Sequence, residues 1–139
     1  MPIKWENMPQ NSIIVFVCEH GTAKSIIAAA YFNKIAHERG LDARAIARGT
    51  NPDSELSSKT IAGLQSDGLA PSESAPQKLT LAEVESAEQV ISFCELPKEF
   101  QGKTSIEQWE GIPSVSDNYQ TARDAILEKL NQLPQFSKF

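Results

Sequence analysis

Hydrophobic positions fall into four short stretches that are separated by longer segments with helical spacing. The first stretch, residues 13–17, contains only β-branched or aromatic side chains. A short, continuously apolar run of this kind is typical of a central parallel strand that is buried on both faces. Residues 43–48 alternate only weakly, which favours an edge strand, and two further strands are predicted at 89–94 and 104–109.

The segments around these stretches predict four helices. Their expected ranges are 25–39, 57–67, 81–87 and 119–133. Thr80 and Glu83 have the spacing of a capping box at the start of the third helix. Ser116 or Asp117 is expected to cap the last helix. The inward-facing positions of that helix are predicted to be Ala122, Ile126, Leu130 and Leu133.

Strands that alternate with helices predict an α/β fold, with a four-stranded parallel sheet covered by helices on both faces. Ligands of such sheets bind at the carboxyl ends of the strands, and Cys18 and Cys94 both fall at such ends. The whole chain, 1–139, is expected to form one domain, with residues 1–11 as an extended lead-in.

Composition argues against several classes of function. The net charge of −5, without a cluster of lysine and arginine, makes nucleic acid or an anionic membrane an unexpected partner. The longest apolar run is far shorter than the roughly 20 residues that a membrane helix needs. Residues 1–12 lack the apolar core of a signal peptide, so we expect a cytoplasmic location. His20 and His37 stand far apart without metal-ligand spacing, so no metal site is predicted.

The junction between the first strand and the first helix predicts an anion site that contains a thiol. The strand ends at Cys18, a turn containing Gly21 follows, and Ser25 begins the helix. This arrangement directs several backbone N–H groups and the positive end of a helix dipole at one point, which favours bound anions. A cysteine in the same field is favoured as the thiolate, which is the nucleophilic form.

The spacing of Cys18, Lys24 and Ser25, written C-x5-K-S, resembles the C-x5-R-S loop of the low-molecular-weight protein tyrosine phosphatase and thioredoxin-coupled arsenate reductase superfamily. The likeness extends over residues 12–133. It implies a flavodoxin-like three-layer sandwich, no organic cofactor, and an oxyanion or phosphomonoester as substrate. It also implies that Cys18 attacks the phosphorus or arsenic and that Ser25 supports the thiolate. The residues implied to hold the oxyanion are Glu19, His20, Gly21, Thr22, Ala23, Lys24 and Ser25.

The chain departs from the superfamily pattern inside the loop. Lys24 replaces an arginine, so a single point charge stands where a planar fork would grip two oxygens. Gly21 stands where relatives usually carry an asparagine. Glu19 adds a negative charge beside the anion site, and His20 could supply a positive charge or a proton.

The general acid of the phosphatases is also missing. They take it from a late Asp-Pro, whereas Ile112 precedes Pro113 in this chain. Asp117 is the candidate replacement, and Glu110 is a weaker one.

Cys94 follows an apolar strand, where the arsenate reductases of the superfamily place the second cysteine of a redox triad. Trp109 is also similar to the tryptophan before their late loop. Residues 95–102 contain no third cysteine, so a three-thiol relay to thioredoxin cannot operate. Cys94 could instead resolve the adduct through a disulfide with Cys18, or an external thiol reductant could do so.

Three classes of function therefore remain open, and an enzyme is favoured. The first is an arsenate-reductase-like thiol enzyme, towards which Cys94 and Trp109 tilt the interpretation. The second is a phosphatase that works through a phosphorylated Cys18. The third is a non-catalytic module that binds an oxyanion.

Overall fold

The computed structural model of the protein describes residues 12–101 and 106–136. The predicted lead-in at 1–11 and the first two positions of the strand predicted at 104–109 lie outside these residues. The elements in chain order are β1 (Ser12–Cys18), α1 (Lys24–Glu38), β2 (Ala43–Gly49), α2 (Ser58–Ser66), α3 (Leu81–Ser86), β3 (Gln89–Ser92), the 3-10 helix η2 (Lys98–Phe100), β4 (Ile106–Gln108) and α4 (Tyr119–Asn131).

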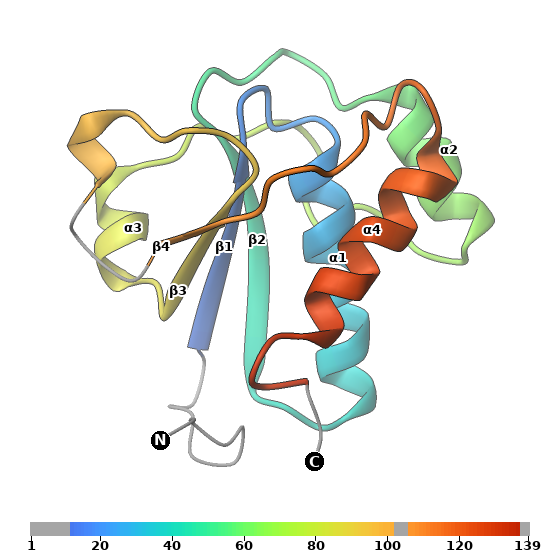
Figure 1. Cartoon of the computed structure of the whole chain (residues 1–139), viewed down its shortest axis with the longest axis horizontal. Coiled ribbons are helices and arrows are strands. Elements are labelled where there is room, and N and C mark those ends of the chain that lie inside the picture. The colour runs from blue at the N-terminus through green and yellow to red at the C-terminus, as the bar shows by residue number, and fades with distance from the viewer. Residues whose placement is uncertain (1–11, 102–105, 137–139) are drawn as a thin grey trace.

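The four strands form one parallel sheet in the order β2-β1-β3-β4, which confirms the predicted α/β fold (Figure 1). The weakly alternating strand β2 lies at an edge, as predicted. The chain leaves β1 for β2 on one side and later returns to place β3 on the other. In open α/β sheets, such a change of direction opens a crevice at the carboxyl ends of the strands.

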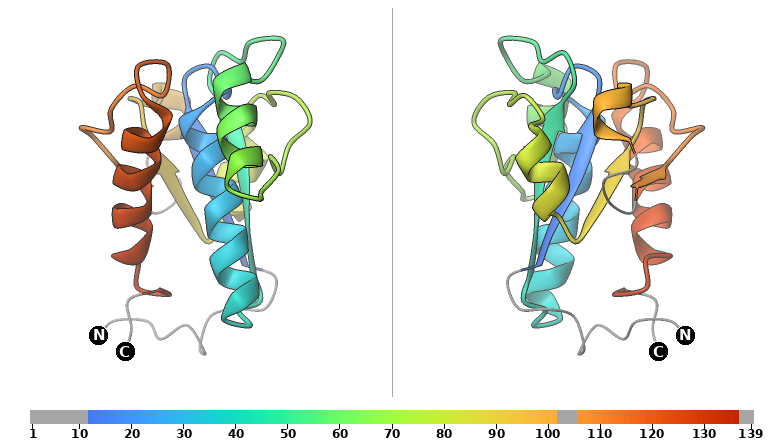
Figure 2. Two further views of the ribbon diagram at one scale, coloured as in Figure 1. Left: turned by 90° about the vertical axis from the view of Figure 1, so that its right-hand side faces the viewer. Right: turned by 90° about the vertical axis from the view of Figure 1, so that its left-hand side faces the viewer.

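Alternating side chains of the sheet enter two separate cores. Ile14 and Phe16 of β1 pack with α1, α2 and α4 on one face. Val15 and Val17 pack on the other face with α3 and η2, which contribute Val84 and Phe100. Figure 2 shows the helices on both sides of the sheet. Within the described residues, no helix is long and apolar enough to cross a membrane.

The outer edge of β2 is covered by groups from elsewhere in the chain. The Asn33 side chain of α1 both donates to the carbonyl of Ala45, at 3.1 Å, and accepts from its amide, at 2.7 Å. Further along the same edge, Gly49 donates to the carbonyl of Gln77 and accepts from the amide of Leu79. These contacts satisfy backbone groups that would otherwise invite pairing with another strand.

Most predicted helix ends are confirmed to within two residues, but one predicted cap is wrong. The capping box of Thr80 and Glu83 is present at α3. At α4, the capping side chain belongs to Asn118, which accepts from the amide of Thr121 at 3.0 Å, and not to Ser116 or Asp117. The reason is that a turn at 115–117 delays the start of the helix until Tyr119. The predicted inward face of α4 is buried.

One carboxylate joins the three helices on the first face. Asp67, at the end of α2, accepts hydrogen bonds from Tyr31 of α1 at 2.5 Å and from Tyr119 of α4 at 2.9 Å. Arg123 of α4 forms an ion pair with it at 3.0 Å. Burial alone would raise the pKa of Asp67, but the hydrogen bonds from both tyrosines and from Arg123 outweigh it and lower that pKa. Burial and the hydrogen bond to Asp67 raise the pKa of Tyr31 to about 12.

These shifts predict a pH dependence of stability. Because the pKa of Asp67 is lowered by folding, its contribution is present above the ordinary aspartate value of 3.8 and is lost as the pH falls through its folded value. Because the pKa of Tyr31 is raised, its contribution is lost as the pH rises from 10.0 through about 12.

We therefore expect Asp67→Asn to have a lower free energy of unfolding than the wild type at neutral pH, and the two free energies to converge in acid. Urea unfolding from about pH 7 down to about pH 2, well below the ordinary aspartate pKa, would check this. The exposed Asp42→Asn is the control, and parallel curves for Asp67→Asn and the wild type would contradict the prediction.

Candidate active site

The predicted anion loop lies between β1 and α1, at the carboxyl edge of the sheet. Cys18 is the last residue of β1, and residues 19–23 lead into Lys24, the first residue of α1. The Sγ atom of Cys18 lies 3.0 Å from the Oγ atom of Ser25. Ser25 is fully buried, so its hydroxyl is fixed against the sulfur. The contact expected between the thiol and this serine is therefore present.

The loop carbonyls are bound by the segment that follows β2. Four backbone amides of this segment donate to loop carbonyls: Thr50 to Cys18 at 3.2 Å, Asn51 to Glu19 at 2.7 Å, Asp53 to His20 at 3.1 Å, and Ser57 to Thr22 at 3.1 Å. In a trans peptide the N–H points opposite to the C=O, so outward carbonyls leave the following amides facing inward. Among the described residues, no oxygen accepts a hydrogen bond from the amides of residues 19–23. The loop is thus a cradle of unpaired N–H groups, which suits an anion.

Two glycines allow this segment to approach the loop so closely. Gly21 has φ +67, a backbone conformation that favours glycine, and a Cβ on it would lie 3.2 Å from the Cα of Gly49. A Cβ on Gly49 would lie 2.8 Å from the amide nitrogen of Gly21. Because both neighbours are backbone atoms, neither can move aside without deforming the loop. Gly49 is therefore required by its close packing against the loop.

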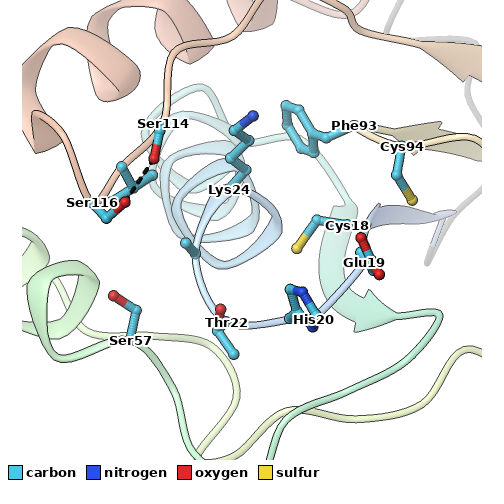
Figure 3. Close-up of a pocket in the computed structure, with 12 residues that line it drawn as sticks. Cys18, Glu19, His20, Thr22, Lys24, Ser57, Phe93, Cys94, Ser114 and Ser116 are labelled. Carbon is cyan, nitrogen blue, oxygen red and sulfur yellow. Dashed lines mark hydrogen bonds between the residues drawn. The ribbon is translucent and has the colours of Figure 1, made fainter.

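The loop forms the floor of an open pocket of about 400 Å³ (Figure 3). Hydroxyl groups of Thr22, Ser57, Ser114 and Ser116 lie around it, and Phe93 supplies an apolar wall. Ser114 and Ser116 are hydrogen-bonded to each other at 2.8 Å. The pocket lining includes Cys18, Glu19, His20, Thr22, Ala23, Lys24 and Cys94. Both cysteines and most of the predicted loop residues therefore line one pocket, whereas Gly21 and the buried Ser25 do not line it.

Lys24 lies at the pocket but its ammonium group is engaged elsewhere. Its Nζ atom donates to the carbonyl of Ile112 at 2.9 Å, and Figure 3 shows the side chain directed away from Cys18. Lys59 of α2 donates to the carbonyl of Ser116 at 2.5 Å. Two lysines from two helices therefore bind the loop between β4 and α4, residues 109–118, which we call the late loop. Lys24 contributes positive charge to the pocket without pointing at its centre.

The candidate acids of the late loop do not line the pocket. Asp117 and Glu110 are both exposed, and neither is among the lining residues, whereas Ser114, Val115 and Ser116 are. His20 does line the pocket, and its Nδ1 atom lies 3.3 Å from the carboxylate of Asp53. Glu19 is the one carboxylate among the lining residues, and its side chain is exposed.

Cys94 reaches the same pocket from β3. The strand ends at Ser92 rather than at the predicted Cys94, and Val17 of β1 is paired with Ser92. The register therefore brings the start of the loop after β3 beside Cys18. The Ser92 hydroxyl lies 3.6 Å from the Cys94 sulfur. Burial raises the pKa of the Cys94 thiol; the hydrogen bond with Ser92 offsets part of this, and charge on Cys18 raises the pKa further.

Sequence comparison identifies the family. Residues 13–133 match the model of the low molecular weight phosphotyrosine protein phosphatases. The chain belongs to this family. No curated protein matches the chain by sequence.

Solved structures of similar fold include both phosphatases and arsenate reductases. YfkJ from Bacillus subtilis superposes with a TM-score of 0.79 at 15% identity, covering 91% of this chain and 94% of that one. A YwlE mutant from the same organism superposes with a TM-score of 0.75 at 23% identity, covering 89% of this chain and 97% of that one. An arsenate reductase from Archaeoglobus fulgidus superposes with a TM-score of 0.67 at 22% identity, covering 87% of this chain and 98% of that one. At these identities the likeness establishes the fold and leaves the reaction open.

Several site features of this family member have no local signal in the sequence. Asp53 meets His20 only because residues 50–57 fold over the loop. The partner of Lys24 is a backbone carbonyl far along the chain, at Ile112. The hydroxyl-rich rim arises from serines on separate elements. Among the described residues, no group of three or more His, Cys, Asp or Glu side chains is placed to hold a metal ion.

We expect Gly49→Ala to damage the anion cradle. The added Cβ would meet the Gly21 nitrogen at 2.8 Å, so the loop must shift at a cost of about 1–3 kcal/mol. Inorganic phosphate should raise the melting temperature of the wild type and fail to raise that of the variant. The control is Gly40→Ala, whose Cβ meets nothing within 4 Å and whose φ of +68 makes it strained but remote from the loop. An equal response to phosphate in Gly49→Ala and in the control would contradict the packing argument.

Proposed function

We propose that this family member is an oxyanion-binding thiol enzyme with arsenate-reductase-like chemistry, in which Cys18 attacks arsenate and Cys94 resolves the adduct. The observation that carries the proposal is that two free cysteines line one pocket whose floor is the cradle of loop amides. The amides and Lys24 attract the oxyanion, and the Ser25 hydroxyl at 3.0 Å supports the Cys18 thiolate.

The proposed reaction has two bond-forming steps. The Cys18 thiolate attacks arsenic(V), an S–As bond forms, and one arsenate oxygen leaves as water after taking up a proton. The Cys94 sulfur, once deprotonated, then attacks the Cys18 sulfur. The S–As bond breaks with its electron pair on arsenic, so arsenite leaves as arsenic(III). The two thiols supply the two electrons and become a disulfide, which a cellular thiol reductant must reduce before another turnover.

The positions of the two sulfur atoms fit this order of events. In Figure 3 the Cys94 side chain is directed towards the strand end that carries Cys18 and Glu19, whereas the Cys18 sulfur points towards the loop. Formation of the disulfide requires the Cys18 side chain to turn towards Cys94. The raised pKa of Cys94 keeps this thiol protonated at neutral pH while Cys18 reacts.

A phosphatase that takes its proton from a carboxyl group of the loop before α4 is less well supported by the pocket. Hydrolysis of a phosphomonoester needs a proton donor for the leaving oxygen. The carboxyl groups of the late loop, Asp117 and Glu110, are absent from the pocket lining.

The test is the intact mass of the reduced protein before and after arsenate treatment. We expect a loss of two mass units, the two thiol hydrogens removed when Cys18 and Cys94 form a disulfide. Neither Cys18→Ser nor Cys94→Ser should show this loss, because each has a single cysteine left.

Two other outcomes would replace the proposal. Unchanged mass together with hydrolysis of an aryl phosphate that Cys18→Ser abolishes would identify a phosphatase. Unchanged mass without hydrolysis, but with a melting temperature raised by phosphate, would identify a binding module without turnover.

A further inference from the structure

We propose that His20, oriented by Asp53, is the general acid that protonates the oxygen leaving the bound oxyanion. The inference rests on the proposed function, since it names the proton donor for the attack of Cys18. It assigns a catalytic role to a residue of the loop itself, in place of the acid that the late loop does not provide.

Asp53 holds His20 at two points. The Asp53 amide donates to the His20 carbonyl at 3.1 Å, and the Asp53 carboxylate lies 3.3 Å from Nδ1 of the imidazole. The backbone of His20 is therefore bonded to the residue whose carboxylate lies beside its ring. The carboxylate favours a proton on Nδ1 and leaves Nε2 as the atom that exchanges a proton with a ligand. Among the described residues, Nε2 has no hydrogen-bond partner.

The position of the ring places it at the reaction. His20 lines the same pocket as Cys18, two residues along the loop, and Figure 3 shows its ring at the rim beside Cys18. About half of its side chain is exposed, at 51%, so Nε2 is accessible to a ligand in the pocket and can be reprotonated from water.

The other lining groups are less suited to donate this proton. Lys24 directs its ammonium group to the Ile112 carbonyl. Glu19 carries a carboxyl that is ordinarily ionised at neutral pH and has no proton to give. Cys94 is needed as the resolving thiol. A histidine is the side chain whose ordinary titration lies closest to neutral pH, which suits an acid that gives and regains a proton in each cycle.

The proton balance of the first step is then complete. The thiolate forms the S–As bond, and the As–O bond to one hydroxyl breaks with the electron pair on oxygen. The imidazolium gives its Nε2 proton to that oxygen, which leaves as water. The neutral imidazole keeps its Nδ1 proton towards Asp53 and is recharged from solvent.

The experiment is a single-turnover measurement of arsenate-driven formation of the Cys18–Cys94 disulfide, quenched by alkylation and read by mass. We expect His20→Ala to lower the rate by about 100-fold or more, since general acids contribute about 10²–10⁴-fold. Added imidazole should restore part of the rate, and Asp53→Asn should cause a smaller loss. His37→Ala is the matched control, because His37 is the second of the two histidines and is exposed near the end of α1. It should react like the wild type, with or without imidazole.

Three results would overturn the inference. The first is a wild-type rate in His20→Ala. The second is a loss that imidazole does not restore although phosphate still raises the melting temperature of His20→Ala. The third is loss of the phosphate effect itself, which would make His20 part of the loop's structure. If the wild type forms no disulfide with arsenate, the proposed function fails first and the role of His20 falls with it.

Discussion

The site depends on one set of backbone hydrogen bonds, those from residues 50–57 to the carbonyls of the loop after β1. An isolated turn of this length would leave amides and carbonyls equally available to water. Because a second segment binds the carbonyls, the amides face inward and have no acceptor among the residues that the structure describes. The contact in turn requires Gly21 and Gly49, whose backbones touch where side chains would collide. Under the proposed function, anion affinity would therefore come from the path of the backbone before any charged side chain contributes.

Those features that depend on local spacing could be predicted from the sequence. The apolar run before Cys18 predicts the buried strand, and the family resemblance of the C-x5-K-S spacing implies the contact that the structure shows between Ser25 and the Cys18 sulfur, at 3.0 Å. The capping box of Thr80 and Glu83 was equally local. Features that depend on the path of a distant segment could not be predicted. The cap at Asn118 follows a turn whose length the spacing does not reveal, and Asp53 reaches His20 only through the fold of residues 50–57.

Lys24 stands where the superfamily pattern implies an arginine, and its hydrogen-bond partner indicates what its ammonium group does instead. An arginine fork can grip two oxyanion oxygens, whereas an ammonium group acts as a point charge. The Lys24 ammonium donates to the Ile112 carbonyl, so it connects the loop to the segment before α4. Lys59 holds the same segment at Ser116. Under the proposed function, the loop amides would therefore do more of the orienting of the oxyanion, while the Lys24 ammonium group holds the segment that leads to the lining residues Ser114 and Ser116.

The two cysteines occupy different physical environments, and this difference bears on the order of the proposed steps. Cys18 faces a hydroxyl and unpaired amides, which favour a negative charge. Cys94 is partly buried, with a pKa raised by burial, and the charge on Cys18 raises it further. Under the proposed function, Cys94 would therefore stay protonated while Cys18 attacks the oxyanion, and it would lose its proton only when it attacks the Cys18 sulfur.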